Sequence, residues 1–171
     1  TVRATAVTGD GTLIPSIAAS AVQDPFGNNN TVSTTTDSTV TYDTGAPTVT
    51  VAQGSSQADP TASTPVIFDV VFSEAIDPVT FIVSDVDQNG TATGVTWTVT
   101  DSGDATSFTV QATAIAGDGT LIPSLALAAV SDVAGNTSAA STAPGDTTVT
   151  YDTTGPTATI EQASGQADPA A

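Results

Sequence analysis

The sequence predicts an all-β protein made of similar units in tandem, and three observations lead to this expectation. Apolar and polar residues alternate along several short segments, as they do in half-buried strands. Thr makes up about a fifth of the 171 residues, and Gly and Pro interrupt the chain often, which favours strands joined by turns. Several peptides also recur along the chain, as expected for repeated structural units.

The recurring peptides define a repeat about as long as one small domain. The pairs are GDGTLIPS at 9–16 and 117–124, TVTYDT at 39–44 and 148–153, and QADP at 57–60 and 166–169. The first pair is separated by 108 residues and the other two by 109, which places a one-residue insertion in a loop around 140–147. We therefore expect an internal segment of a longer tandem protein. Its expected parts are the end of a preceding repeat (1–43), a complete repeat (44–152) and the first strand of a following repeat (153–171).

Seven strands are expected in the complete repeat. In chain order they are 48–53, 66–73, 79–84, 91–100, 107–115, 120–127 and 147–152. The pattern is clearest in PVIFDVVFS, where Val66, Phe68, Val70 and Phe72 share one face and Asp69 lies on the other.

The fourth and fifth strands follow the same pattern, through Trp97 in GVTWTVTD and through Phe108 and Val110 in SFTVQATA. The sixth begins after GDGT (117–120), where Asp-Gly is expected to close a hairpin from the fifth strand. Seven short strands in one repeat predict an immunoglobulin-like β-sandwich of two antiparallel sheets, although the Cys…Trp…Cys pattern of antibody domains is missing. Trp97 is expected in the core, and a platform that stacks on carbohydrate is the alternative.

The charge of the chain excludes several functions. There are 18 acidic residues and a single basic one, Arg3, which gives a formal net charge of −17. Nucleic acid and anionic membrane surfaces are therefore not expected partners, because both require Lys and Arg. Cys and His are absent, so disulfides, thiolate sites and the usual zinc ligands are excluded. Without His, Cys or Lys, an enzyme is not expected; only a pair of carboxylates acting on glycosides would be available.

A series of motifs resembles a known family. The motifs are GAPTVTV (45–51), QADP (57–60), VIFDVVFSEAI (66–76), FIVSDV (81–86), GTATG (90–94), GDGTL (117–121), SDVAGN (131–136) and TVTYDTTGP (148–156). In this order they resemble the bacterial immunoglobulin-like tandem repeats of giant calcium-dependent (RTX-type) cell-surface adhesins. The resemblance implies a secreted, extracellular protein of the bacterial surface, with calcium bound where neighbouring repeats meet.

Strand alternation makes an independent geometric prediction. If the strands run up and down in turn, the loops after the second, fourth and sixth strands lie where the chain enters the repeat. Acidic and amide side chains from these loops would then meet Asp43 on the linker, and calcium prefers such oxygen ligands. The expected ligands are Asp43, Glu74, Asp132 and Asn136, then Asp77, with Asp24, Asn28 and Asp152 at the corresponding positions of adjoining repeats.

Other interpretations of these motifs remain open at this stage. Asp132 and Asn136 could belong to a turn in which Gly135 is left-handed, without any metal. Asp10 and Asp118 could be turn residues of GDGT or ligands. DVDQNG (85–90) matches the first half of an EF-hand loop, but it lacks the Glu of position 12 and is better explained as a turn before the fourth strand, with an accessory calcium at that end of the sandwich as the alternative.

We therefore expect a structural role without catalysis. Tandem sandwiches would form an extender, or stalk, of a large surface adhesin or biofilm matrix protein, stiffened by calcium between neighbouring repeats of the same chain. One alternative is an adhesive or carbohydrate-binding module, although the chain has only eight aromatic residues. A second is a subunit of a surface fibre that assembles laterally with other copies.

Overall fold

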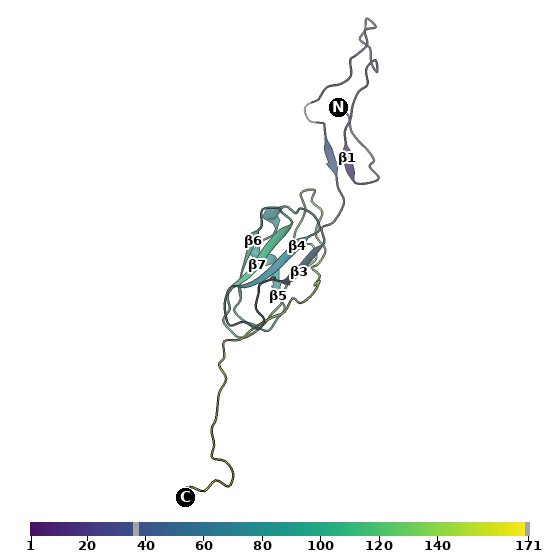
Figure 1. Ribbon diagram of the computed structural model, residues 1–171. Helices are drawn as coiled ribbons and strands as arrows, with labels where there is room; N and C mark the ends of the chain where they lie inside the picture. Colours follow the sequence, from purple (N-terminus) through teal and green to yellow (C-terminus); the bar gives the residue numbers. More distant parts are fainter. Residues whose placement is uncertain (36–37, 170–171) are drawn as a thin grey trace.

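The protein is elongated, with a β-sandwich at its centre (Figure 1). The computed structural model describes residues 1–35 and 38–169, so residues 36–37 of the predicted first part and 170–171 of the predicted last part lie outside the described residues. The N-terminal segment leaves one end of the sandwich and the C-terminal segment leaves the other. The described residues contain β-strands and two 3₁₀ turns but no α-helix. None of their helical turns has the length and apolar character needed to cross a membrane.

The larger sheet of the sandwich has four antiparallel strands. They are β3 (Val49–Gln53), β4 (Val66–Phe72), β7 (Ser107–Ala114) and β6 (Thr96–Asp101), in that spatial order. The alternation seen in the sequence is confirmed here, because Val66, Phe68, Val70 and Phe72 are all buried while the residues between them are not. The expected strands at 48–53, 66–73 and 107–115 are therefore confirmed to within one residue at each end.

Two shorter antiparallel pairs cover the inner face of this sheet. β5 (Val86–Gln88) pairs with β9 (Pro123–Leu125), and β8 (Gly119–Leu121) pairs with β10 (Val149–Tyr151). The apolar side chains of both pairs join those of the larger sheet in one buried cluster. An antiparallel sheet with one apolar face needs such a cover, so the two layers together form the core.

Aromatic side chains fill the middle of the core. Phe72, Phe81 and Phe108 meet edge to face, with ring centroids 5.2 to 5.7 Å apart. Trp97 is buried and lies edge to face against Phe68, with 6.0 Å between the centroids. The expectation that Trp97 belongs to the core is confirmed, and its ring is not available as a carbohydrate platform.

The strand expected at 79–84 is wrong. Two 3₁₀ turns, η1 (Pro78–Thr80) and η2 (Val83–Asp85), occupy this segment. The Asp77 carboxylate accepts a hydrogen bond from Val79 N–H, and the Asp85 carboxylate accepts one from Ile82 N–H, so each turn is closed by its own acid. The third strand is β5 instead, and DVDQNG therefore supplies a strand rather than the expected turn or an EF-hand loop.

Three other details of the expected strands also differ. The strand expected at 91–100 begins only at Thr96, after Gly94 takes a left-handed φ of 62°. The strand expected at 120–127 is divided into β8 and β9 at Ile122, whose N–H donates to the Gln88 side chain. The hairpin expected at GDGT is absent, because β7 and β8 belong to different layers and the peptide carries the chain between them.

The N-terminal segment repeats one pairing of the sandwich. β1 (Gly11–Leu13) and β2 (Val40–Tyr42) are antiparallel, with Gly11 opposite Tyr42 and Leu13 opposite Val40. One repeat length later, the same register joins β8 to β10. The internal repeat therefore extends from sequence to strand pairing.

Neighbouring residues of β4 give a matched test of the core. Val70 is fully buried whereas Val71 is 47% exposed. We expect Val70→Ala to lower the free energy of unfolding by about 2 kcal/mol, because two buried methyl groups are lost and a cavity remains. Val71→Ala should change it by less than about 0.5 kcal/mol. Urea unfolding of both variants measures the difference, and equal effects would contradict this assignment of the two faces.

Candidate metal centre

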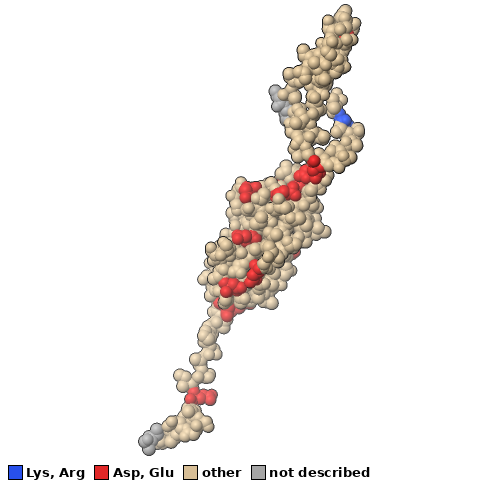
Figure 2. Space-filling model, turned by 45° about the vertical axis from the view of Figure 1, so that its right-hand side comes forward, with Lys and Arg blue, Asp and Glu red and all other residues tan. Residues whose placement is uncertain are grey.

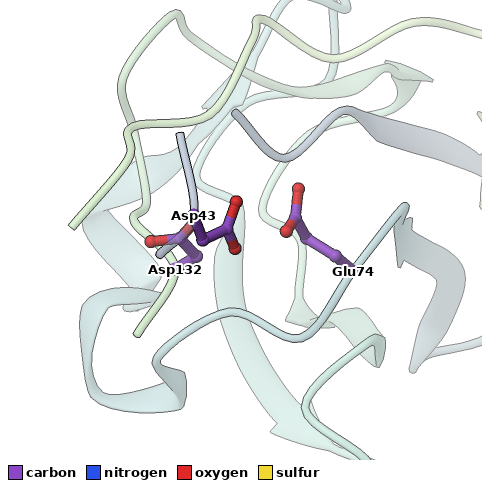
Figure 3. A group of neighbouring side chains, drawn as sticks. All are labelled: Asp43, Glu74 and Asp132. Atoms are coloured by element: carbon purple, nitrogen blue, oxygen red, sulfur yellow. The ribbon is translucent and has the colours of Figure 1, made fainter. Parts of the chain in front are cut away.

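Three carboxylates meet where the chain enters the sandwich (Figure 3). Asp43 follows β2 on the linker, Glu74 follows β4, and Asp132 lies in the loop between β9 and β10. Each offers a carboxylate oxygen, and these oxygens all lie within 4.8 Å of one another. Asp132 is only 5% exposed, and the other two are half-buried. The predicted convergence of Asp43, Glu74 and Asp132 is thus present in the structure.

The turn that holds Asp132 is made by its own sequence. The carboxylate of Asp132 accepts hydrogen bonds from the backbone and side-chain N–H groups of Asn136, both at 2.8 Å. Gly135 has a φ of 95°, which an L side chain rarely adopts, so the turn requires glycine there. The turn interpretation of D-x-x-G-N is therefore correct, and the same turn also carries Asp132 into the cluster.

The preceding part of the chain forms the same turn. Asp24 accepts the same two hydrogen bonds from Asn28, both at 2.9 Å, and Gly27 has a φ of 85°. This copy has no described counterpart of Glu74 beside it. The geometry of the turn therefore arises locally and does not depend on the rest of the acidic cluster.

Asp43 is held by contacts from both sides of the junction. The N–H and Oγ1 of the next residue, Thr44, both donate to one carboxylate oxygen of Asp10, at 3.0 and 2.8 Å. From the other side, the Asn136 amide donates to the Asp43 carbonyl at 3.2 Å. We call the contact between Asp10 and Thr44 the first clasp. It fixes the linker at the point where Asp43 turns towards Glu74.

A second clasp stands at the other end of the sandwich. Asp118 accepts hydrogen bonds from the N–H and Oγ1 of Thr153 and from Oγ1 of Thr154. These bonds hold the pKa of Asp118 below its usual value. The sequence signal for both clasps was the repeated GDGT, for which we had expected a hairpin turn. The two Asp residues instead fasten the linker that follows each copy.

Acidic side chains gather where the N-terminal segment meets the sandwich, and others are spread over the rest of the molecule (Figure 2). Partial burial, and then the negative charges of Asp43, Asp132 and Asp10, raise the pKa of Glu74 above its ordinary value. Burial also opposes the charge of Asp132, but the hydrogen bonds from Asn136 and from the backbone outweigh it and lower the pKa of that carboxyl. Asp132 is thus stabilised as an anion by the protein, whereas Glu74 has no such compensation.

The remaining predicted residues lie in different surroundings. Asn136 directs its amide N–H groups to the Asp132 carboxylate and to the backbone carbonyl of Asp43, so it orients one carboxylate and holds the backbone that carries another. Asp77 belongs to the same end of the sandwich but caps η1. Asp152 repeats the local geometry of Asp43, since each accepts a hydrogen bond from the N–H two residues on, at 2.9 Å. Asp24 and Asn28 form the turn described above, away from the triad.

Other acids near the site serve turns. Asp104 accepts hydrogen bonds from the N–H groups of Ser107 and Thr106, which lower its pKa to about 2. Asp101 accepts one from Gly103 N–H. Asp87, from DVDQNG, is exposed on β5. Asp104 and Asp101 are thus engaged locally, and within the described residues the triad is the group whose carboxylates lie close enough together to hold a metal ion.

The triad has the composition of a site for a hard cation. Its pocket is also lined by Thr41, Ala75 and Val133 and opens to solvent, so water can complete a coordination shell. Three carboxylates without His or Cys suit oxygen-binding cations rather than soft transition metals. The three residues could therefore hold one metal ion.

Comparisons with protein-family models, with curated proteins and with solved structures gave no significant match. The role of the site is therefore inferred from its own geometry and from the internal repeat.

Glu74 gives a test of the repulsion in the metal-free protein. We expect Glu74→Gln to raise the free energy of unfolding near neutral pH, because it removes a charge that folding forces against other anions. The raised pKa means that folding takes up a proton at pH values between the ordinary pKa of 4.5 and the raised one, so the wild type gains stability as the pH falls through that raised pKa. The advantage of the variant should therefore vanish below about pH 4.5.

The chain contains one other glutamate, and it serves as the control. Glu161 is exposed in the C-terminal segment, so Glu161→Gln should leave the unfolding curve unchanged at every pH. Chemical unfolding in the presence of a chelator measures both variants. A Glu74→Gln protein that is less stable than the wild type near neutral pH would contradict the proposed repulsion.

Proposed function

We propose that this chain is a structural segment of an extended bacterial surface protein, in which calcium binds between consecutive immunoglobulin-like repeats and stiffens the junction. The observation that carries the proposal is the origin of the three carboxylates. Asp43 arrives on the linker from the preceding part, whereas Glu74 and Asp132 belong to the sandwich. An ion held by all three would connect two consecutive parts of the chain.

Calcium is the cation that best fits this set of ligands. It takes six to eight oxygen ligands, and a cluster of carboxylates with water can supply them without strict geometry. Extracellular calcium is in the millimolar range, so even a site of about 0.1 to 1 mM affinity would be occupied outside the cell and empty in the cytosol. This difference would allow the chain to be secreted before its junctions stiffen.

The strand arrangement supports the immunoglobulin-like part of the proposal. If β3, β4, β5, β6 and β7 are labelled A to E, the larger sheet has the order A-B-E-D. The remaining strands would then be C, F and G, with F divided into β8 and β9. This is the division between two layers that constant-type immunoglobulin sandwiches have.

The role as an extender is supported by the shape of the molecule and by its repeated clasps. The chain enters at one end of the sandwich and leaves at the opposite end (Figure 1). At each end an Asp of the GDGT peptide fastens the first residues of the linker, through the same atoms. Successive units joined in this way would extend along one direction rather than fold back on each other.

A titration tests whether the triad binds calcium. We expect Asp43→Asn to weaken calcium binding by more than about tenfold, because it removes one of three charged ligands. Asn136→Ala should weaken it by about 10- to 100-fold, because the side chain that orients Asp132 is lost. Isothermal titration calorimetry at fixed pH measures both effects.

Asp152→Asn is the matched control for the titration. Asp152 stands in the second copy of the TYDT peptide, at the position that Asp43 has in the first, but it does not belong to the triad. Its variant should therefore bind calcium at this site as the wild type does. Wild-type protein that takes up no calcium at millimolar concentration, or an Asp43→Asn variant that binds it normally, would contradict the proposal.

The stiffening can be measured separately from the binding. We expect calcium to narrow the distribution of distances between the N-terminal segment and the sandwich, because one ion then restrains the linker from both sides. Small-angle X-ray scattering with calcium and with chelator measures this in the whole chain. Asp43→Asn should give the chelator profile under both conditions. Identical wild-type profiles would refute a mechanical role even if calcium is bound.

A further inference from the structure

The N-terminal segment exposes apolar side chains whose counterparts form the core of the sandwich. Val40 is 59% exposed, whereas Val149, one repeat length later, is fully buried. Ile17 and Val22 are exposed as well, and their counterparts are buried. The corresponding pairs are Val2 with Val110, Ile17 with Leu125, Val22 with Val130, and Val40 with Val149.

The backbone around Ile17, Val22 and Val40 is already in the geometry of the complete copy. Ser33 N–H donates to the Ile17 carbonyl at 2.9 Å, and Ser141 N–H donates to the Leu125 carbonyl at the same distance. Ser20 and Ala128 have left-handed φ angles of 61° and 60°. The exposed face is therefore a preformed copy of a surface that is covered elsewhere in the same molecule.

Residues 1–6 show how the structure of this peptide depends on pairing with neighbouring strands. Their sequence, TVRATA, differs at one position from TVQATA at 109–114, which forms most of β7. β7 is hydrogen-bonded to β4 along one edge and to β6 along the other. Among the described residues, no strand is hydrogen-bonded to residues 1–6, and they are not a strand themselves. Nearly the same peptide thus takes a different structure where no strand pairs with either of its edges.

The single difference between these two peptides lies at a position on the outer face of the strand, where a change of side chain does not disturb the packing of the two layers. Val110 and Ala112 are fully buried, and the matching positions are Val2 and Ala4. Gln111 is only half-buried on the outer face, and Arg3 replaces it. The positions that a second layer would cover are unchanged, as expected if this segment is also packed against one.

We propose that residues 1–35 and 38–42 are a docking face for three strands of the β3, β4 and β6 type, carried by a further stretch of the same polypeptide that resembles residues 45–108. Residues 1–6 become the third strand of a four-stranded sheet, between a strand like β4 and a strand like β6. In β7 the residue Val110 lies opposite Phe68 and Val99, so Val2 is placed opposite Phe and Val in the docked sheet.

The edge of the docked sheet is defined in the same way. In the complete copy, β3 runs parallel to the segment around Thr142, and Thr142 exchanges hydrogen bonds with Val49 and Val51 at 2.9 and 3.0 Å. Thr34 corresponds to Thr142. A strand of the sequence Val-Thr-Val is therefore the expected neighbour of residues 31–35. None of these contacts involves the acidic triad, so the proposal is independent of calcium.

The experiment extends the whole chain by its own sequence. A second copy of residues 45–108 is placed directly before Thr1, which reproduces the connection that joins Phe108 to Thr109 in the complete copy. Amide hydrogen exchange of residues 1–6 is then compared with that of the 171-residue chain, both in chelator. We expect these amides to exchange at least about 100-fold more slowly in the extended chain, because they enter a hydrogen-bonded sheet.

A register variant is the matched control. Deletion of the added Phe108 shifts the joined strand by one residue and turns Val2 to the outer face, so the protection should be lost. Unchanged exchange at residues 1–6 in the extended chain would overturn the proposal. The docking face could instead be covered by a second copy of the chain, and sedimentation of the 171-residue chain tests this. A dimer in which residues 1–6 are already protected and Val40 is buried would also overturn the proposal.

Discussion

Neither layer of the sandwich can bury its apolar face without the other, and the rest of the structure depends on this mutual cover. The four-stranded sheet holds its aromatic side chains against the two short pairs, and the loops that join the layers are fixed as a result. Glu74 and Asp132 leave opposite layers at the same end, so the packing of the core brings them together. The acidic junction is thus a consequence of the layer order.

Periodicity predicted the strands that are covered on one side along their whole length, such as β4 and β7, because burial itself produces the alternation. It failed at 79–84, where the residues look like a strand but Asp77 and Asp85 close two turns with their own carboxylates. It could not place GDGT either, since a turn between strands of one sheet and a crossing between two layers use the same residues. Which layer a strand joins is decided by partners far along the chain.

For the candidate site, the alternation of strand direction was enough to predict which loops meet, and hence the group of Asp43, Glu74 and Asp132. The groups that position these carboxylates were harder to predict from the sequence. Asn136 was expected among the ligands, and the structure shows its amide N–H groups donating hydrogen bonds to the Asp132 carboxylate and to the backbone carbonyl of Asp43. The clasp of Asp118 joins residues 35 positions apart through a backbone N–H and hydroxyls; the repeated GDGT marks the aspartate but does not show which residues pair with it.

If units of this kind follow one another in a longer array, as proposed, the clasps would also determine its geometry. Asp10 and Asp118 grip the residue after the Tyr-Asp pair through the same two donors, so each unit sets the direction in which the chain leaves it. A constant rotation and a constant rise at every joint generate a regular superhelix. Its pitch would depend on the two hydrogen bonds that one threonine donates to one aspartate at each joint. The length of the filament would increase in equal steps with each added unit.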